Sequence, residues 1–425
     1  MKNKKSLTIL LALFISLGVS AQETYTLDEC KELAKKNNIE LKISQLSVEE
    51  ASQIRKESFT NFFPKVSASG MGYYTKDGLL GKDIPTMFGL PDMKKGYLAE
   101  ITVEQPIFAG DQIYYGNKLA QAGEEISHYQ SAESEKNMML AVEQYYWTLI
   151  SLYEKRQTIN IMDDLAASLH KDVKVAVNAG VTNRNDLLKV ELKQNEIKNS
   201  SLELENGIKL IKMQLAQIVG VPDTEFNIQE SANKELIDPQ SFWINHNQAL
   251  LNTNSYHLLN KNIEVNQLKL KMKRGEYLPS VGIGASYSYS DIFADKGYSS
   301  SMLYVSVSIP ISDWWGGSHA IKQQKAQVKM AEYTKRDSEQ KILIQMQKYQ
   351  NMLNEAYDKV LLAKQAIETA QENVRLNTDS YKSGLSIISD LIDAQSLLQQ
   401  SRDRYTEAYT GYLISQSIYM KETGR

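Results

Sequence analysis

Hydrophobic and polar residues alternate along four short segments of the chain. In residues 281–290 the odd-numbered positions are apolar or aromatic, and the even-numbered positions are glycine or serine. Residues 97–104 and 301–309 alternate in a similar way, whereas residues 65–74 alternate poorly. Because successive side chains of a strand point to opposite faces, the alternation is typical of strands with two unlike faces. We predict strands at residues 65–75, 97–107, 280–290 and 301–310.

Most of the remaining chain carries apolar residues at spacings of three and four, which is typical of amphipathic helices. The run from Ile342 to Leu361 shows this spacing clearly. Pro64 and Gly220 are expected to end helices, because proline breaks a helix and glycine commonly follows its last turn. The predicted helices comprise residues 26–60, 111–178 and 185–219 and, later in the chain, residues 245–277, 317–380 and 389–421.

These elements occur twice in the same order. FTNFFPKVSASGMGYY (residues 59–74) corresponds to RGEYLPSVGIGASYSY (residues 274–289), which indicates a repeat architecture. In each repeat the two shorter helices together nearly match the long one, as in the wall of a tube about 100 Å long. We divide the chain into repeat 1 (22–220), a connector or equatorial segment (221–242) and repeat 2 (243–425).

The first 21 residues have the features of a signal peptide. Three lysines precede an apolar run from Leu7 to Leu17, and the small residues Val19, Ser20 and Ala21 follow it. The apolar run is too short for a permanent membrane helix. We expect residues 1–21 to be a signal peptide and the chain to be exported.

The predicted strands fit a membrane barrel. Strands of about 10 residues with one apolar and one polar face are typical of such barrels, the alternative being a hairpin of a soluble sheet. Four strands cannot close a membrane barrel, and lipid does not tolerate open sheet edges. Eight strands from two chains would be filled by side chains, so the pattern favours an oligomeric channel of three or more chains. Residues expected to face its lumen are Glu100, Thr102, Glu104, Ser286, Ser288, Ser306 and Ser308.

Composition excludes several other functions. The formal net charge of -3 gives no electrostatic footprint for nucleic acid. The five histidines are scattered, and the chain has no HExxH motif, no paired catalytic carboxylates and no glycine-rich phosphate loop. We therefore expect no enzymatic activity, no cofactor and no metal site, and the single Cys30 cannot form an internal disulfide.

The chain resembles the TolC-like outer membrane efflux family over nearly all of residues 22–425. The resemblance lies in the doubled order of TLDECKELAKKNN and its degenerate copy WINHNQALLNTN, FFPKVSASG and YLPSVGIGA, and two glycine turns followed by Asp-Leu. It implies a mainly α fold with a membrane β-barrel: a homotrimer with a 12-stranded barrel in the outer membrane and a long helical tunnel in the periplasm. A periplasmic adaptor protein would connect the trimer to an inner membrane transporter.

The resemblance also implies a periplasmic gate at the glycine turns. Tyr381 corresponds to a tyrosine that helps to hold the tunnel tip closed, Asp390 and Asp393 to constriction carboxylates, and Asp186 to an aspartate that receives a closing bond. Ser386 stands where some relatives have an arginine, so closure is expected to be weaker or held differently. Alternatively, Asp186 and Asp390 stabilise helix N-termini, since both lie in a predicted first turn.

The glycine turns are the expected contact with the adaptor. Each glycine allows the positive φ that a tight turn between antiparallel helices requires. The predicted contact residues are Ala179, Gly180, Val181, Thr182, Ser383, Gly384 and Leu385.

We therefore expect a passive outer membrane channel-tunnel of a tripartite efflux or export system. The alternatives are the outer membrane duct of a type I protein secretion system and, from another class, an exported coiled-coil structural or adhesion protein. The sequence leaves the cargo open among drugs, metals and proteins.

Overall fold

The computed structural model describes residues 24–78, 93–222, 226–229, 235–291 and 297–425. The predicted signal peptide lies outside the described residues. The chain is mainly helical with one four-stranded antiparallel sheet, which confirms the predicted fold class. It divides into two compact units: unit 1 has the described residues up to 44, Ala132–Thr253 and Lys341–Arg425, and unit 2 has Gln45–Ser131 and Asn254–Gln340.

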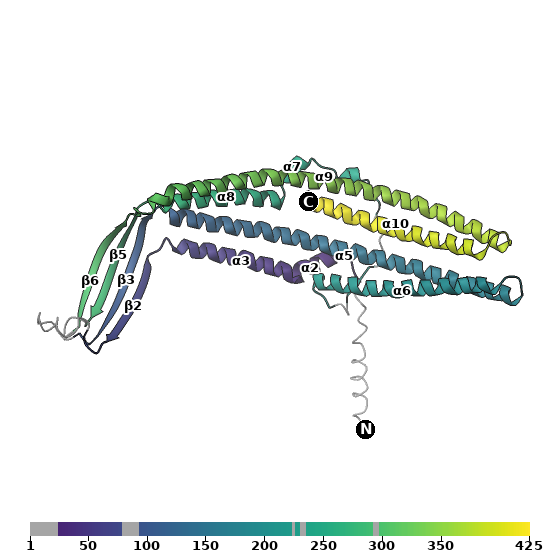
Figure 1. The fold of residues 1–425 in the computed structure, drawn as a ribbon, viewed down its shortest axis with the longest axis horizontal. Helices are drawn as coiled ribbons and strands as arrows, with labels where there is room; N and C mark the ends of the chain where they lie inside the picture. The colour runs from purple at the N-terminus through teal and green to yellow at the C-terminus, as the bar shows by residue number, and fades with distance from the viewer. Residues whose placement is uncertain (1–23, 79–92, 223–225, 230–234, 292–296) are drawn as a thin grey trace, which may run out of the picture. The chain divides into compact units, whose positions relative to one another are not determined.

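The sheet belongs to unit 2 and joins one hairpin from each repeat (Figure 1). All neighbouring strands are antiparallel. The two hairpins meet where β3 (Lys95–Ala109) pairs with β5 (Ser280–Ser290), and Glu100 lies directly opposite Ser288. The register shifts between Pro106 and Phe108, where proline cannot donate a backbone hydrogen bond. In spatial order the strands are β2 (Lys65–Tyr74), β3 (Lys95–Ala109), β5 (Ser280–Ser290) and β6 (Tyr298–Ser308).

Four helices contribute to unit 2: α3 (Ile39–Thr60), α5 (Gln112–Asn178), α8 (Asn254–Gly275) and α9 (Trp314–Lys382). Arg55 of α3 bonds Glu124 of α5 at 2.8 Å. The backbones of Gly110 and Gly275 approach so closely that a Cβ on Gly275 would lie 2.0 Å from the carbonyl oxygen of Gly110. The two repeats therefore contact each other where strand β3 leads into α5 and where α8 ends.

Unit 1 contains the remaining elements and most of the described core. Its elements are β1 (Thr24–Tyr25), α2 (Leu27–Asn37), α6 (Arg184–Val219), β4 (Asn227–Ile228), the 3-10 helix η1 (Pro239–Phe242), α7 (His246–Leu251), α10 (Ile388–Glu422) and parts of α5 and α9. Short strands β1 and β4 pair in parallel. The core packs residues from α2, α5, α6, α9 and α10, among them the fully buried Cys30, Leu149, Leu215, Leu353 and Tyr419.

Two helices differ from the sequence expectation. The predicted helix 26–60 is divided at Asn38, whose Oδ1 accepts from the backbone N–H of Leu41 and starts α3. The Asn38 amide also donates to the carbonyl oxygen of Ile218 in α6, at 2.9 Å. The predicted helix 245–277 is likewise divided between α7 and α8, where the Thr253 hydroxyl donates to the carbonyl oxygen of Leu250. Side-chain bonds to the backbone thus interrupt the corresponding helix of each repeat.

No helix within the described residues combines the length and apolar character required to cross a membrane.

Candidate functional site

One face of the sheet is mainly polar. Residues directly opposite each other on antiparallel strands project to the same side, so the register assigns each residue to a face. Glu100 is opposite Ser69 and Ser288, and Thr102 is opposite Ser67 and Ser286. The register puts all seven residues predicted to face a lumen on one face of the sheet: Glu100, Thr102, Glu104, Ser286, Ser288, Ser306 and Ser308.

The opposite face is apolar and open. Leu303 on this face is 86% exposed, which is unusual for a leucine in a packed sheet. The residues that share the face include Val66, Ala68, Ile101, Val103, Ile283, Ala285, Leu303 and Val305. A sheet with this division can separate an aqueous side from a lipid side.

A tyrosine spans part of the polar face. The Tyr304 hydroxyl donates to Oε1 of Glu104 at 2.7 Å, from β6 across β5 to β3. The ring lies over Gly284, where an added Cβ would come within 2.3 Å of a ring carbon. Glycine at position 284 is therefore what lets the tyrosine reach the glutamate.

The two helix tips have the same backbone geometry. Gly180 between α5 and α6 has φ of 71°, and Gly384 between α9 and α10 has φ of 70°. In both turns the residue after glycine donates its N–H to a carbonyl oxygen of the preceding helix: Val181 to Ala176 and Leu385 to Ser380. The side chains of Val181 and Leu385 are 80% and 83% exposed. Each tip thus presents an apolar side chain to the surroundings.

The predicted gate residues lie next to these tips in unit 1. Neither Asp186 nor Asp390 is the residue that caps its helix: Asn183 caps α6, and the cap position of α10 is Ile387. Both aspartates lie in the first turn, and the Thr182 hydroxyl donates to Asp186. Asp390 and Asp393 are exposed.

A small apolar cluster joins the two helical hairpins beside the tips. It consists of Val173 on α5, Val190 on α6, and Ile388 and Leu391 on α10, each at most 3% exposed. Tyr381 packs against the cluster, and its burial, together with nearby Asp186 and Asp172, raises the pKa of its phenol. The cluster therefore brings predicted gate residues of both repeats together.

Lys189, which was not among the residues predicted from the sequence, links the two helical hairpins. The Lys189 ammonium of α6 donates to the hydroxyl of Ser389 on α10 at 2.8 Å, and it lies 3.9 Å from the Asp186 carboxylate. The Ser386 hydroxyl oxygen is buried and has no hydrogen-bond partner among the described residues. The polar link at the tip is thus made by Lys189 and Ser389 and not by Ser386. The only feature of the sequence that could have pointed to Lys189 was its spacing from Asp186, which places both residues on one helix face.

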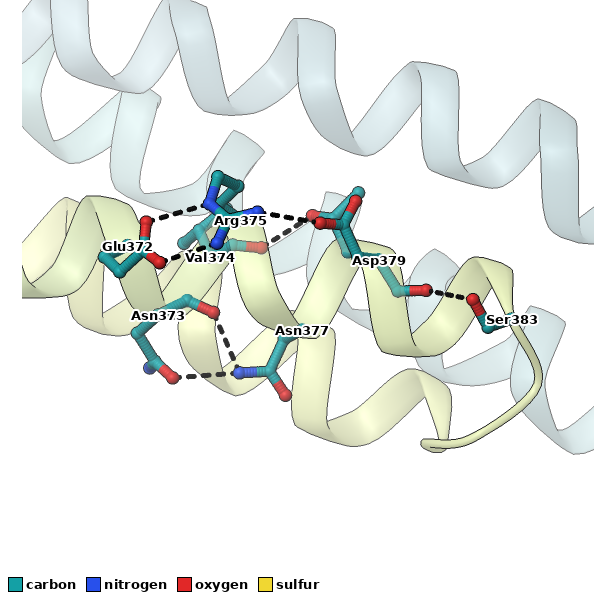
Figure 2. Close-up of polar contacts among 8 residues, drawn as sticks. Glu372, Asn373, Val374, Arg375, Asn377, Asp379 and Ser383 are labelled. Atoms are coloured by element: carbon teal, nitrogen blue, oxygen red, sulfur yellow. Dashed lines mark hydrogen bonds and ion pairs between the residues drawn. The ribbon is translucent and has the colours of Figure 1, made fainter.

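The last turns of α9 carry a polar network that sequence reasoning also missed (Figure 2). The Arg375 guanidinium lies between Glu372 and Asp379 and donates to them at 2.7, 2.8 and 3.0 Å. These bonds lower the pKa of Glu372. The Ser383 hydroxyl donates to the backbone carbonyl oxygen of Asp379 at 2.8 Å, so one of the last carbonyls before the Gly384 turn is satisfied.

No group of three or more histidine, cysteine, aspartate or glutamate side chains in the described part of the chain could hold a metal ion.

Comparison with known proteins agrees with this description. Residues 247–417 match the family described as "Outer membrane efflux protein". The chain is 19% identical over 330 residues to the alkaline protease secretion protein AprF of Pseudomonas aeruginosa, covering 75% of this chain and 68% of AprF.

Solved outer membrane channels share the fold. The Campylobacter jejuni CmeC channel superimposes with a TM-score of 0.81 at 14% identity, covering 94% of this chain and 85% of CmeC. VceC of Vibrio cholerae gives a TM-score of 0.77 at 12% identity, covering 94% and 96% of the two chains. The open MtrE channel of Neisseria gonorrhoeae gives 0.74 at 14% identity, covering 94% and 88%. Residues 247–417 thus match the outer membrane efflux protein family and the chain has the TolC-like fold, which agrees with the resemblance seen in the sequence.

Proposed function

We propose that this protein is the outer membrane channel-tunnel of a tripartite efflux or export system. The observation that carries the proposal is the sheet, which has one polar face, one apolar face and two edges, β2 and β6. Lipid does not tolerate unpaired strand edges, so the edges must pair with other copies of the chain. TolC-like channels form trimers, and three copies would supply twelve strands.

In this proposal the polar face lines the lumen and the apolar face contacts outer membrane lipid. The helices extend into the periplasm as a tunnel. Five of the seven predicted lumen residues are small and hydroxylated, so the duct would conduct passively without recognising a particular cargo molecule. Cargo selection would then belong to the inner membrane transporter.

The helix tips are the proposed contact with the periplasmic adaptor. Val181 and Leu385 are exposed apolar side chains next to glycine turns, and such side chains fit the groove of a helical hairpin. The proposed contact comprises Ala179, Gly180, Val181, Thr182, Ser383, Gly384 and Leu385.

The proposed gate lies beside this contact. Threefold symmetry would turn Asp390 and Asp393 into rings of carboxylates at a narrow point, where they attract cations and repel anions. Tyr381 and Asp186 would hold the hairpins together in the closed state, with Lys189 providing the polar link that Ser386 does not make.

A type I protein secretion duct is the second candidate. The similarity to AprF, whose name describes alkaline protease secretion, favours it specifically. Deleting the gene and measuring drug sensitivity, metal sensitivity and the secreted proteome in parallel would separate the candidates. Loss of secreted proteins without a change in drug or metal sensitivity would favour secretion.

The proposal itself is tested by fractionation and conductance. We expect the mature protein in the outer membrane fraction, with heat-modifiable migration on gels, a trimer mass in detergent and ion conductance in planar bilayers. A water-soluble monomer that needs no detergent would refute the channel.

The adaptor contact is tested with Leu385→Asp. We expect loss of export with an intact trimer, because a charged tip cannot enter an apolar groove. Leu385→Met keeps the apolar surface and serves as the matched control. Normal export by the aspartate variant would exclude this residue from the contact.

A further inference from the structure

We propose that Glu100 gives the sheet-lined part of the channel a preference for cations. This inference rests on the proposed function, because it requires the polar face of the sheet to line a pore. It concerns a selectivity element at the strands, separate from the aspartates at the helix tips.

Only three charged side chains occur on the polar face within strands β2, β3, β5 and β6. They are Lys65, Glu100 and Glu104. Lys95, another charged strand residue, is opposite Tyr74 and so belongs to the apolar face. The polar face therefore has one excess negative charge per chain, and the register shows which glutamate carries it.

Glu104 is compensated by its neighbours. Lys65 is directly opposite it on β2, where paired Cβ atoms lie about 4.5–5.5 Å apart. The Tyr304 hydroxyl donates to its carboxylate from the other side. Lys65 and Glu104 therefore place one positive and one negative charge at the same level of the sheet, which leaves no net charge there.

Glu100 has no such compensation. Its directly opposed residues are Ser69 and Ser288, and Ser288 in turn is opposite Ser300. Hydroxyl groups can hydrogen-bond a carboxylate but leave its charge in place. Position 100 is four residues from position 104, or about 13 Å along the strand, which exceeds the Debye length of about 8 Å at physiological salt. Lys65 therefore does not neutralise Glu100.

In a threefold assembly the Glu100 side chains form one ring of three uncompensated carboxylates. The ring formed by Glu104 and Lys65 alternates in sign and has no net charge. A ring of carboxylates in a pore attracts cations and repels anions. Positively charged cargo and small cations would thus pass the strand region more readily than anions.

The test measures reversal potentials of reconstituted trimers under a KCl gradient. The background carries Asp390→Asn and Asp393→Asn, so that the tip carboxylates do not contribute. We expect this background to favour potassium over chloride, Glu100→Gln to lower the permeability ratio several-fold toward unity, and Glu100→Asp to keep it. The matched control removes the compensated pair together, with Lys65→Gln and Glu104→Gln, and should leave the ratio unchanged.

A Glu100→Gln channel with the ratio of its background would overturn the inference, and so would a pair-deletion channel that loses selectivity equally. Heat-modifiable migration confirms that each variant is assembled, and Glu100→Lys should reverse the preference toward chloride. Failure of the unmodified protein to conduct at all would count against the proposed function instead. The two failures are therefore distinguishable.

Discussion

Gly110 and Gly275 show how single residues determine backbone contact between the repeats. Gly110 has φ of 58° and is followed by Asp111 with φ of 59°, so the chain turns sharply from β3 into α5. The absence of side chains lets the turn approach the end of α8. Glycine is needed at both positions because of a neighbouring backbone and, at Gly110, also because of its positive φ.

Gly275→Ala should destabilise the protein by about 1–3 kcal/mol, because the added Cβ would meet a rigid carbonyl and force backbone movement. The midpoint of thermal unfolding in detergent measures the effect. Gly123→Ala is the matched control, since no atom lies within 4 Å of a Cβ there and alanine is the better helix former by about 1 kcal/mol. Equal unfolding midpoints for the two variants would contradict the contact.

Cys30 is an isolated thiol inside the core of unit 1. It is fully buried, and desolvation raises its pKa to about 12 from an ordinary value of 9.0. The protonated thiol is the unreactive form. In the folded protein this residue is therefore an apolar core residue, in agreement with the absence of a disulfide.

We expect no alkylation of Cys30 by iodoacetamide at pH 8 in the folded protein and rapid alkylation after denaturation. The unfolded thiol loses its proton near pH 9 while the folded one keeps it, so this group's contribution to stability falls as pH rises from about 9 to 12. A Cys30→Ala Glu32→Cys variant moves the thiol to an exposed position on the same helix and should react quickly. Rapid labelling of native Cys30 would show that α2 opens readily.

At the scale of elements, sequence patterns predicted the repeat, the strands and the glycine turns, but not the helix interruptions. Asn38 lies within an amphipathic pattern that gives no sign of a helix end. The hydrogen bond that holds its side chain at the interruption goes to a carbonyl oxygen of α6, which is far away in the sequence. The bond between Lys189 and Ser389 escaped prediction for the same reason, since it joins separate hairpins. Local periodicity is enough to predict the helices and strands, whereas these side-chain hydrogen bonds depend on how the helices pack against one another.

Lys189→Ala should favour the open state of the proposed gate, because it removes a charge-assisted hydrogen bond between α6 and α10. The side chain is 36% exposed, so screening limits the effect to about 1 kcal/mol, or roughly a fivefold change in the open-to-closed ratio. Single-channel recording measures this ratio.

Lys193→Ala provides the control, since Lys193 pairs with Glu196 of its own helix. Combining Lys189→Ala with Ser389→Ala should add little to either single change if the two side chains act as a pair. Additive effects would mean that Lys189 acts elsewhere.

At the scale of the whole molecule, the two faces of the sheet decide how copies assemble. A single chain exposes an apolar face and two strand edges, and both features are incompatible with an isolated chain in water or lipid. The number of strands and their alternation could be read from the sequence. The complete register could not, because the bulge at Pro106 shifts it by local backbone geometry.

Leu303→Lys should reduce the amount of assembled trimer in the outer membrane. A lysine on the lipid face near the middle of the bilayer costs about 2–4 kcal/mol per site, and three copies would carry it. Heat-modifiable migration of the membrane fraction measures assembly. The neighbouring Met302→Lys change places the same charge on the polar face and should be tolerated; a reversed outcome would invert the assignment of faces.

The parallel pairing of Thr24–Tyr25 with Asn227–Ile228 has a consequence for biogenesis. Because these segments are so distant in the chain, the first strand must wait unpaired until the middle of the polypeptide has been exported. Tyr25, which stacks on Phe226 in the finished protein, stays accessible during this interval. A periplasmic chaperone that recognises aromatic residues would therefore find its target in the newly translocated chain and lose it when this short pairing forms.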